Sequence, residues 1–387
     1  MSCPAQHDAV VVGGGPAGAS VACLLARQGK AVLLLERDSE PRHKICGEFI
    51  SIEAVRDLAR IGVRVEALGG SPIGKVRLSS GRSTVEADLP FEGVGLTRRM
   101  LDEALLRQAE ASGASVRRGV VVRSVVSNGA ALNVLPRGDY ALKASAVFLA
   151  TGKHDLNDPR RSPGTSGNDL IGFKTYFTLL PRERRALLGW IEIILFDGGY
   201  AGLQCVEGGA VNLCLLVQRS VYDAVGRSWT RLLDHLMHGS PHLRQRLGGA
   251  EAILAKPLSI ANVPYGFVHR PGAADPTGLF RLGDQMGVIP SFCGDGIAIA
   301  LHTSRLAAAV YAEHGTAAPT YHARAGADIQ GPIRLASALY ALSRMRLGRR
   351  ALVAACGLYP GILRAVAAKT RVQERDWREA QPTATAR

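Results

Sequence analysis

The chain arranges its apolar residues in two different patterns, and each predicts its own kind of structure. Near the N-terminus, Ala9–Val12 and Ala31–Leu35 are short, wholly apolar runs, which are typical of parallel strands buried on both faces. The apolar segment between them fits a helix that closes at Gly29. The order strand, helix, strand predicts a βαβ unit that opens an α/β domain.

The second pattern lies in the middle of the chain and predicts an antiparallel sheet. Its strand-like runs are Ile171–Phe177, Trp190–Phe196, Tyr200–Val206 and Val211–Val217. Gly-Gly pairs at 198–199 and 208–209 separate the last three runs, as hairpin turns do. Lys75–Asp88 fits a further hairpin of this sheet, and Asp223–Leu247 fits a helix interrupted by a proline.

The turn after the first apolar run carries three spaced glycines that point to a bound nucleotide. In Gly13-x-Gly15-x-x-Gly18, the first glycine suits a tight turn and the second lets a pyrophosphate approach the backbone. Gly18 lets the helix pack on the strand, and the helix N-terminus attracts the phosphates. Glu36 follows Gly13 by 23 positions, near the spacing at which an acid reaches ribose hydroxyls. These features predict an adenine dinucleotide cofactor.

A segment near residue 280 resembles flavoproteins of the p-hydroxybenzoate hydroxylase type and identifies the dinucleotide as FAD. In Leu279–Ala298, a strand ends in a Gly-Asp pair, and a glycine-rich loop leads into a helix. In that family the aspartate binds the ribityl chain, and the following proline and glycines lie against the isoalloxazine ring. The matching positions here are Asp284, Pro290, Gly294 and Gly296. The helix N-terminus would then point at the N1/O2 edge of the ring.

Two further segments resemble the same family. Arg98 opens an R-x-x-L-D-x-x-L stretch whose arginine lies by the ribityl–phosphate arm, and Val147–Gly152 resembles the turn that closes the dinucleotide domain. The family's D-G motif is replaced by Lys153-His154-Asp155, so a hydroxylase-like path for nicotinamide is not implied. The resemblance implies FAD contacts from Gly13, Gly15, Pro16, Ala17, Gly18, Glu36, Arg37, Lys44, Cys46, Arg98, Ala150, Thr151, Gly152, Gly283, Asp284, Pro290, Gly294, Gly296 and Ile297.

The segment Pro41–Glu48 resembles the K-x-C-G stretch of geranylgeranyl-reductase-like flavoproteins, a branch that adjoins the flavin halogenases. In that branch the cysteine lies near the flavin, at the substrate cavity. Cys46 and His43 are therefore the candidate catalytic residues, and cationic neighbours would favour a reactive thiolate. The alternative is a small, inert, buried cysteine. Cys293 is a second, weaker candidate thiol.

The resemblance leaves several reactions open. The leading interpretation is an FAD-dependent monooxygenase that acts on a small, largely apolar organic substrate through a flavin C4a-hydroperoxide, with the sheet excluding water. The alternative is a reductase of C=C bonds in isoprenoid or polyketide chains, and an electron-transfer module is disfavoured by the large substrate region. Halogenation is disfavoured because Phe196–Leu203 lacks the W-x-W-x-I-P signature. Electrons would come from NAD(P)H or from a partner reductase.

Composition limits the partners and the compartment. The 387 residues carry 47 basic and 33 acidic side chains, but no nucleic-acid-binding motif accompanies the excess. Apolar residues alternate with basic ones over 344–371, which fits either a helix on anionic lipid or, as we favour, a terminal helix packed on the body. The substrate itself could be carrier- or lipid-linked. Seven cysteines without metal-ligand spacing predict a reducing cytoplasm and no metal site.

These motifs predict an interleaved α/β architecture. A Rossmann-like FAD-binding domain of the p-hydroxybenzoate hydroxylase/glutathione reductase-2 type is expected to enclose an α+β substrate domain with an antiparallel sheet. The FAD-binding domain would comprise 1–74, 94–160 and 270–312, and the substrate domain 75–93 and 161–269. A C-terminal helical region is expected over 313–379, and a disordered tail over 380–387.

Overall fold

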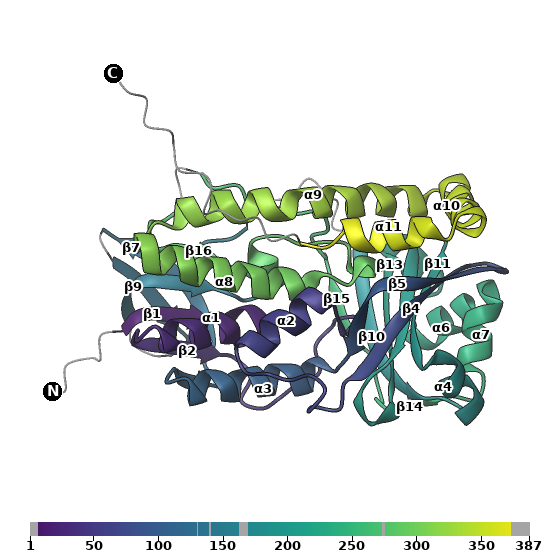
Figure 1. Ribbon diagram of the computed structural model, residues 1–387, viewed down its shortest axis with the longest axis horizontal. Coiled ribbons are helices and arrows are strands. Elements are labelled where there is room, and N and C mark those ends of the chain that lie inside the picture. The colour runs from purple at the N-terminus through teal and green to yellow at the C-terminus, as the bar shows by residue number, and fades with distance from the viewer. Residues whose placement is uncertain (1–6, 130, 139–140, 162–168, 273–274, 373–387) are drawn as a thin grey trace, which may run out of the picture.

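The computed structural model describes residues 7–129, 131–138, 141–161, 169–272 and 275–372. They form two sheets side by side, with helices on their faces (Figure 1). The tail expected over 380–387 lies outside the described residues.

The first sheet contains the nucleotide-binding unit. Its strands are β1 (His7–Val12), β2 (Val32–Glu36), β6 (Ser115–Arg118), β7 (Val122–Asn128), β8 (Ala131–Pro136), β9 (Leu142–Leu149) and β16 (Leu279–Arg281). The order is β6-β2-β1-β9-β8-β7, and β16 also pairs with β9. The pairs β1–β2, β1–β9, β2–β6 and β9–β16 are parallel, which brings the ends of β1, β2 and β16 to one edge. The predicted βαβ unit is confirmed.

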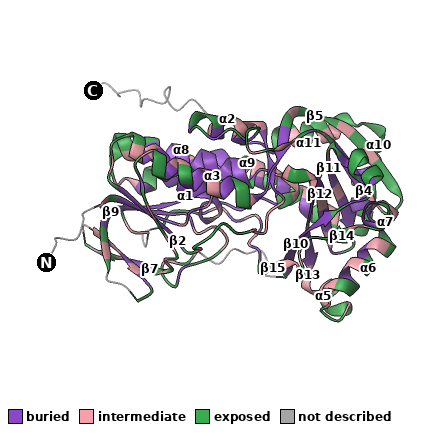
Figure 2. Cartoon of the chain, turned by 90° about the horizontal axis from the view of Figure 1, so that it is seen from below, coloured by how far each residue is buried: buried purple, intermediate pink, exposed green. Residues whose placement is uncertain are grey.

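Helices cover one face of this sheet and bury its apolar residues. They are α1 (Pro16–Arg27), α3 (Arg98–Ala111) and α8 (Gly296–His314), and α2 (Ile52–Arg60) packs on α8 and on β5. Figure 2 shows α1 and α8 largely in the colour of buried residues, in agreement with one core cluster that they share with β1 and β2. The helix expected from Gly296 is confirmed, so the flavin-facing loop lies between β16 and the N-terminus of α8.

The second sheet is predominantly antiparallel. Its strands are β3 (Phe49–Ile50), β4 (Ser71–Ser80), β5 (Ser83–Gly95), β10 (Leu170–Thr178), β11 (Gly189–Phe196), β12 (Gly199–Cys205), β13 (Val211–Gln218), β14 (Glu251–Ala252) and β15 (Leu258–Ala261). The expected hairpin forms as β4–β5, and the four central runs form β10 to β13. Only β11 and β4 pair in parallel within this described sheet.

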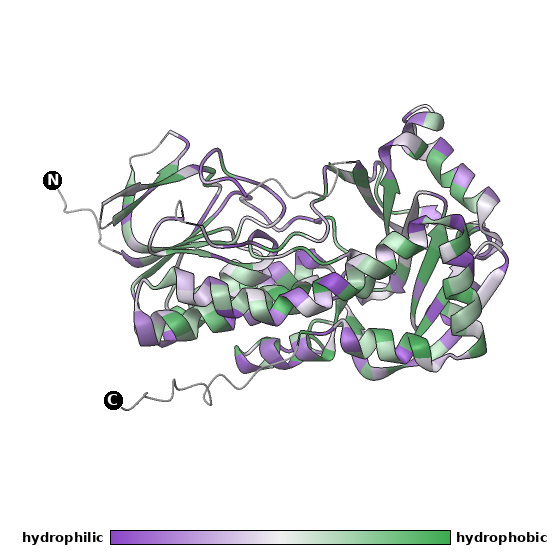
Figure 3. Ribbon diagram, turned by 90° about the horizontal axis from the view of Figure 1, so that it is seen from above, coloured by the Kyte–Doolittle hydropathy of each residue, from purple (hydrophilic) through white to green (hydrophobic). Residues whose placement is uncertain are grey.

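Short helices and a C-terminal group complete the second half. α4 (Pro181–Leu187), α5 (Arg219–Ala224), α6 (Trp229–Gly239) and α7 (Pro241–Leu247) lie by the second sheet, and Pro241 separates α6 from α7 as expected. α9 (Ala318–Arg344) spans both halves, and α10 (Arg346–Leu358) and α11 (Gly361–Lys369) lie over β4 and β5 (Figure 1). Figure 3, viewed from that side, shows hydrophobic and hydrophilic residues mixed along the helices that face the viewer.

The strand β3 ties the two sheets together near Cys46. Phe49 and Ile50 pair with Gly95 and Val94 of β5, although they follow directly on the segment that leaves β2. This pairing holds the turn that precedes β3 between the two sheets. A candidate site at this junction can therefore draw side chains from both.

Candidate active site

The glycine turn is built so that only glycines fit its main positions. Gly13 has a φ of 105°, and a Cβ there would lie 2.4 Å from the Ala150 oxygen. A Cβ on Gly18 would lie 1.8 Å from the Gly13 oxygen, since α1 packs directly on the turn. At Gly15, the residue before α1, the backbone is open to the groove. This arrangement leaves the N-terminus of α1 free to face a phosphate.

Glu36 ends β2 beside this turn. Its Oε2 accepts a hydrogen bond from the Gly14 N–H, and its Oε1 accepts one from the Asp38 N–H at 3.0 Å. The Lys44 Nζ lies 3.8 Å from Oε1. The carboxylate is buried and fixed at the edge of the groove, where the motif places a ribose-binding acid.

Two charged pairs mark the middle of the groove. Arg98 donates to both carboxylate oxygens of Asp102, at 2.7 and 2.8 Å, which fixes the guanidinium at the start of α3. Lys153 donates to Asp284 Oδ2 at 2.9 Å. Burial opposes the charge of Lys153, but Asp284 outweighs it and raises the pKa of the lysine. Lys153 thus occupies the place of the family's D-G motif as a cation.

A continuous depression joins these groups. An open groove of about 1690 Å³ runs from Glu36 to Asp284, and it meets a cavity of about 1380 Å³ that lies between the two sheets. Both are lined by Gly15, Arg98, Gly152 and Asp284. The groove begins at the glycine turn and has nearly as much polar as apolar lining, whereas the cavity walls are mostly apolar. This shape and these donors fit FAD, with the nucleotide in the groove and the flavin ring in the cavity.

Most of the expected FAD contacts line this depression. The residues that line it are Gly13, Gly15, Pro16, Ala17, Glu36, Arg37, Lys44, Cys46, Arg98, Ala150, Thr151, Gly152, Gly283, Asp284, Gly294, Gly296 and Ile297. Gly18 lies behind the turn, in keeping with its packing role. Pro290 is buried between two lining residues, Ile289 and Ser291, and does not itself reach the cavity. The expectation of a direct contact from Pro290 is not supported by its position.

Cys46 lies in the cavity, on a tightly held turn. The Asn212 side-chain amide donates to the carbonyls of Cys46 and Gly47, at 3.2 and 2.8 Å. The Glu48 N–H donates to the Cys46 sulfur at 3.3 Å, and Glu48 has a φ of 63°. This left-handed conformation is uncommon for a residue with a side chain, and it turns the Glu48 carboxyl back toward β10.

The cations expected around Cys46 are engaged elsewhere. Arg42 lies 3.4 Å from Asp38, and Lys44 lies 3.4 Å from Asp102. Both cations are thus paired with carboxylates, and the electropositive setting expected for the thiol stays a prediction. The cations on the cavity itself are Arg98 and Lys153.

Behind Cys46 lies a buried acid–base cluster that sequence reasoning missed. The Glu48 Oε1 accepts the Arg98 N–H at 2.7 Å and the Tyr176 hydroxyl at 2.8 Å. The fully buried Lys174 pairs with the same carboxylate and donates to the Lys44 carbonyl at 3.0 Å. Burial raises the pKa of Glu48, and the lysine opposes this shift. A lysine inside the apolar run 171–177, and an acid two residues after Cys46, were the available signals.

His43 joins this cluster from the groove. Its Nδ1 lies 3.0 Å from the Tyr176 hydroxyl, and the ring lines the groove rather than the flavin cavity. Burial and the charge of Lys174 lower the pKa of His43, so the neutral ring is favoured. Contacts thus run from the open groove through His43 and Tyr176 to Glu48 at the cavity wall. His43 therefore contacts Tyr176 and does not line the flavin cavity.

The walls beyond the flavin position come from the second sheet. Ile191, Ile193, Tyr200 and Leu216 contribute, and the Tyr200 hydroxyl lies 2.6 Å from that of Tyr265. The antiparallel sheet therefore encloses the cavity on the side that the sequence predicted. Lys75, at the start of the predicted hairpin, does not line the cavity; it is exposed, with its Nζ 5.3 Å from the centre of the Trp190 ring.

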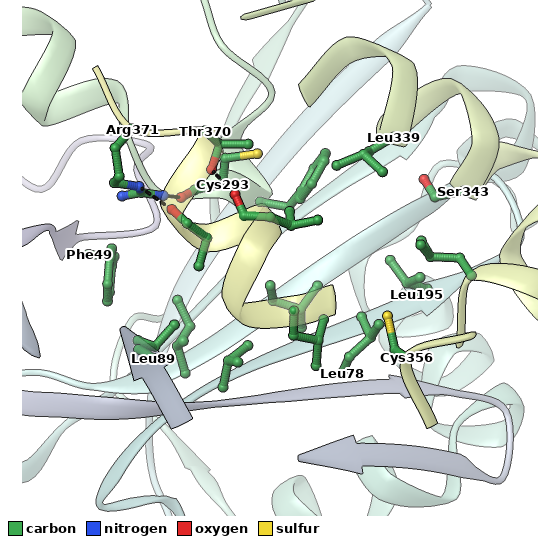
Figure 4. A pocket seen from close by; sticks show the side chains of 18 of the residues that line it. Phe49, Leu78, Leu89, Leu195, Cys293, Leu339, Ser343, Cys356, Thr370 and Arg371 are labelled. Atoms are coloured by element: carbon green, nitrogen blue, oxygen red, sulfur yellow. Dashed lines mark hydrogen bonds between the residues drawn. The ribbon is translucent and has the colours of Figure 1, made fainter. Parts of the chain in front are cut away.

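A second, more apolar cavity adjoins the first (Figure 4). It lies between β4, β5 and β11 on one side and α9 to α11 on the other, and with its open mouth included it measures about 850 Å³. Phe49, Ile191, Ile193 and Phe292 line both cavities. Cys293 faces this second cavity, where burial raises the pKa of its thiol to about 12. The protonated thiol is unsuited to the reactive role considered for it.

Comparison with known proteins agrees with this site. Residues 6–137 match the family model described as "FAD binding domain". The menaquinone reductase of Mycolicibacterium smegmatis is 30% identical over 334 residues, which cover 80% of this chain and 77% of that protein. The menaquinone reductase of Mycobacterium tuberculosis strain H37Rv is 33% identical, but the match covers only 31% of this chain and 30% of that protein.

Solved structures extend the likeness of fold over nearly the whole chain. The flavin-dependent brominase Bmp2 superposes with a TM-score of 0.79 at 17% identity, covering 95% of this chain and 93% of that one. At this identity the likeness concerns the fold alone. Taken with the match to the mycolicibacterial reductase over 80% of this chain and with the groove that fits FAD, these findings show that the chain belongs to the p-hydroxybenzoate hydroxylase-like family of FAD-binding flavoproteins and is an FAD-dependent oxidoreductase.

Proposed function

We propose that the chain is an FAD-dependent reductase of a C=C bond in a largely apolar substrate of the isoprenoid or polyketide class. The observation that carries the proposal is the turn Cys46–Glu48. It places a thiol at the wall of a mostly apolar cavity, directly in front of a buried acid–base cluster. Reduction of a C=C bond requires a hydride on one carbon and a proton on the other. Bound FAD in its reduced form supplies the hydride.

The chain's own residues supply the proton and exclude water. Cys46 lines the cavity that would hold the substrate, and Glu48, Tyr176 and Lys174 hold a proton behind it. His43 contacts Tyr176 from the open groove, so a proton given up by the cluster can be replaced from solvent. Two electrons and one proton thus arrive as hydride, and the second proton comes through the cluster.

The similarity to a named reductase supports the same proposal. The mycolicibacterial relative that matches this chain over most of its length is a menaquinone reductase, and a menaquinone combines a ring with an isoprenoid chain. The two adjoining cavities, both mostly apolar, suit a substrate of that chemistry. Electrons for the flavin would come from NADH, NADPH or a partner reductase.

A monooxygenase acting on a small apolar substrate is the second candidate, and one observation favours it. Gly294, Gly296 and Ile297 at the start of α8 line the cavity, so a helix N-terminus faces the place of the flavin ring. The positive end of this helix would stabilise negative charge on the reduced flavin ring. The reaction of a reduced flavin with oxygen also benefits from that stabilisation. We place this candidate second because the proton-holding cluster and the reductase that matches 80% of this chain both favour reduction.

Isotope labels distinguish the two reactions. The FAD-loaded protein, reduced with dithionite under argon, is mixed with short-chain menaquinone, farnesol or geranylgeranyl diphosphate in D₂O. If the chain is a reductase, product forms under argon, and each product molecule carries two added hydrogens, at least one of which is deuterium. The monooxygenase gives no product under argon and one ¹⁸O atom under ¹⁸O₂. A protein that cannot be loaded with FAD contradicts both candidates.

Substitution of Cys46 tests the role of the turn. We expect Cys46→Ser to keep FAD bound and to lower reductive turnover at least tenfold, because the hydroxyl is a much weaker acid than the thiol. The control is Cys293→Ser, which alters the neighbouring cavity only and leaves turnover within about twofold. Unchanged turnover in Cys46→Ser would make this thiol structural and would contradict the proposed route of the proton.

A further inference from the structure

The C-terminal helices leave large apolar side chains in the open. Of ten large hydrophobic residues exposed in the described part of the chain, five lie between 342 and 359. Leu347, Leu358 and Tyr359 are 77%, 76% and 70% exposed, and Leu342 and Met345 are nearby in sequence. Leu347, Ala351, Ala354 and Leu358 recur at helical spacing on the outer side of α10. This stripe continues into Tyr359 at the start of the loop to α11.

The same region carries only positive charge. From Ile329 to Val372 the sequence contains eight arginines and lysines and no aspartate or glutamate. The exposed members along this surface are Arg344, Arg346, Arg350, Arg364 and Lys369. Arg349 is buried instead and pairs with Asp197 on the inner side of α10. The exposed basic side chains therefore border an apolar stripe, and neither α10, α11 nor the last four turns of α9 carries an acid.

The inner sides of these helices are packed, as the sequence favoured. Val353 and Cys356 of α10 are buried, and Leu363 and Val366 of α11 line the second cavity. Packing on the body thus accounts for one face of each helix and leaves the other face unexplained. Among the described helices, none alone is long and apolar enough to cross a membrane, while α10 and α11, bent by 111°, pass that test together by length and composition.

We propose that the outer face formed by Arg344–Leu358 and Tyr359–Lys369 binds the surface of an anionic membrane. Leu347, Leu358 and Tyr359 would enter the interface between headgroups and acyl chains, while the basic side chains contact anionic headgroups. The charge of the surface selects an anionic bilayer over a neutral one. Its apolar stripe selects a bilayer over a soluble polyanion, which offers nothing to bury Leu347 and Leu358.

A bound membrane would lie directly outside the second cavity. α10 and α11 form the outer wall of that cavity, which shares Phe49 and Phe292 with the flavin cavity. An apolar substrate dissolved in the bilayer would then have a short, apolar path to the flavin. This path rests on the proposed function, whereas membrane binding itself requires no substrate and no turnover.

Vesicle sedimentation of the FAD-loaded, full-length protein tests the binding. We expect the protein to pellet with vesicles of phosphatidylcholine and phosphatidylglycerol at 3:1, and at least fivefold less with phosphatidylcholine alone. Leu347→Asp/Leu358→Asp and, separately, Arg346→Glu/Arg350→Glu should each lower the pelleted fraction at least fivefold. Absorbance of bound FAD and the thermal midpoint check that each variant is folded.

Matched controls carry the same changes on another surface. Leu188→Asp/Ile253→Asp introduces the same new charges at two exposed apolar positions away from the stripe, which are 48% and 50% exposed, and Arg182→Glu/Arg185→Glu gives the same net charge as the arginine variant. Both should pellet like the unaltered protein. Absence of binding to the anionic vesicles, or equal losses in the controls, overturns the proposal. A dimer in light scattering that Leu347→Asp/Leu358→Asp dissociates also overturns it, since the stripe would then be a self-association surface.

Discussion

At the scale of single residues, Glu48 holds more parts of the site in place than any other residue discussed above. Its left-handed backbone costs of the order of 1 kcal/mol, and it is held there by the Arg98 N–H, the Tyr176 hydroxyl and Lys174. The same contacts fix the start of α3 and the position of Cys46. One carboxyl therefore links the strained turn, the helix that carries Arg98 and the wall of the cavity.

The Lys174–Glu48 pair should be strongly coupled in stability. Lys174→Met leaves a buried carboxyl without its cation, and we expect a loss of about 3–5 kcal/mol in the free energy of unfolding. The double variant Lys174→Met/Glu48→Gln should lose less free energy of unfolding than Lys174→Met alone, since no unpaired charge remains buried. Urea unfolding at pH 7 measures both, and a double variant that is less stable than Lys174→Met would contradict the pairing.

Gly18 should be irreplaceable at the turn. The Cβ of Gly18→Ala would lie 1.8 Å from the Gly13 oxygen, so α1 must move away from the turn. We expect FAD affinity to fall at least tenfold, measured by quenching of flavin fluorescence. Gly239→Ala is the control, because a Cβ there meets nothing within 4 Å. Equal FAD affinity in Gly18→Ala and Gly239→Ala would show that α1 can shift without cost.

At the scale of elements, a buried charge network attaches α7 to the second sheet. Glu192 of β11 accepts hydrogen bonds from His242 and Arg246, and Arg246 also bonds Glu183 of α4. Burial would raise the pKa of Glu192, but these hydrogen bonds outweigh it and hold the pKa at about 2. The network therefore orients two helices on the sheet only while Glu192 is ionised.

Stability should consequently fall in acid. Because the pKa of Glu192 is depressed when folded, its contribution is present above its unfolded pKa and is lost as the pH falls from about 4.5 toward 2. The shift corresponds to up to about 3 kcal/mol. Urea unfolding at pH 6 and pH 3 should show Glu192→Gln less stable at pH 6 and closer to the unaltered protein at pH 3. The control is Glu86, an exposed partner of Arg77. We expect Glu86→Gln to change the free energy of unfolding little at either pH.

At the scale of the whole molecule, the FAD depression draws residues from both sheets. The groove contains Glu36 of β2 and Ile260 of β15, and the cavity contains Gly15 and Leu216. A cofactor bound across this junction must be released before the sheets separate. FAD therefore acts as a structural connection as well as a reactant.

FAD should raise the stability of the whole chain. At a free concentration of 100 times its Kd, we expect a gain of about 2.7 kcal/mol, seen equally by far-ultraviolet circular dichroism and by tryptophan fluorescence. Asp284→Ala should bind FAD about tenfold more weakly and gain about 1.4 kcal/mol less at the same FAD concentration. Stabilisation confined to one of the two probes would show that the sheets unfold separately.

The sequence by itself determined the features that depend on local geometry. The glycine turn, its strands and the helix at Gly296 follow from contacts between near neighbours in the chain, and so does the family to which these motifs belong. The antiparallel strands and the interruption at Pro241 follow from apolar spacing and from a residue that cannot continue a helix.

Only the tertiary structure decided which distant side chains meet. Lys174 reaches Glu48 across more than a hundred residues because β10 passes behind the turn before β3, and no local pattern encodes that contact. The same packing turned Cys293 into the neighbouring cavity and Lys75 into solvent. It also buried one face of α10 and left Leu347 outside. The spacing of apolar residues predicts that a helix has an apolar and a polar face. Which element, cavity or solvent each face contacts depends on the tertiary packing.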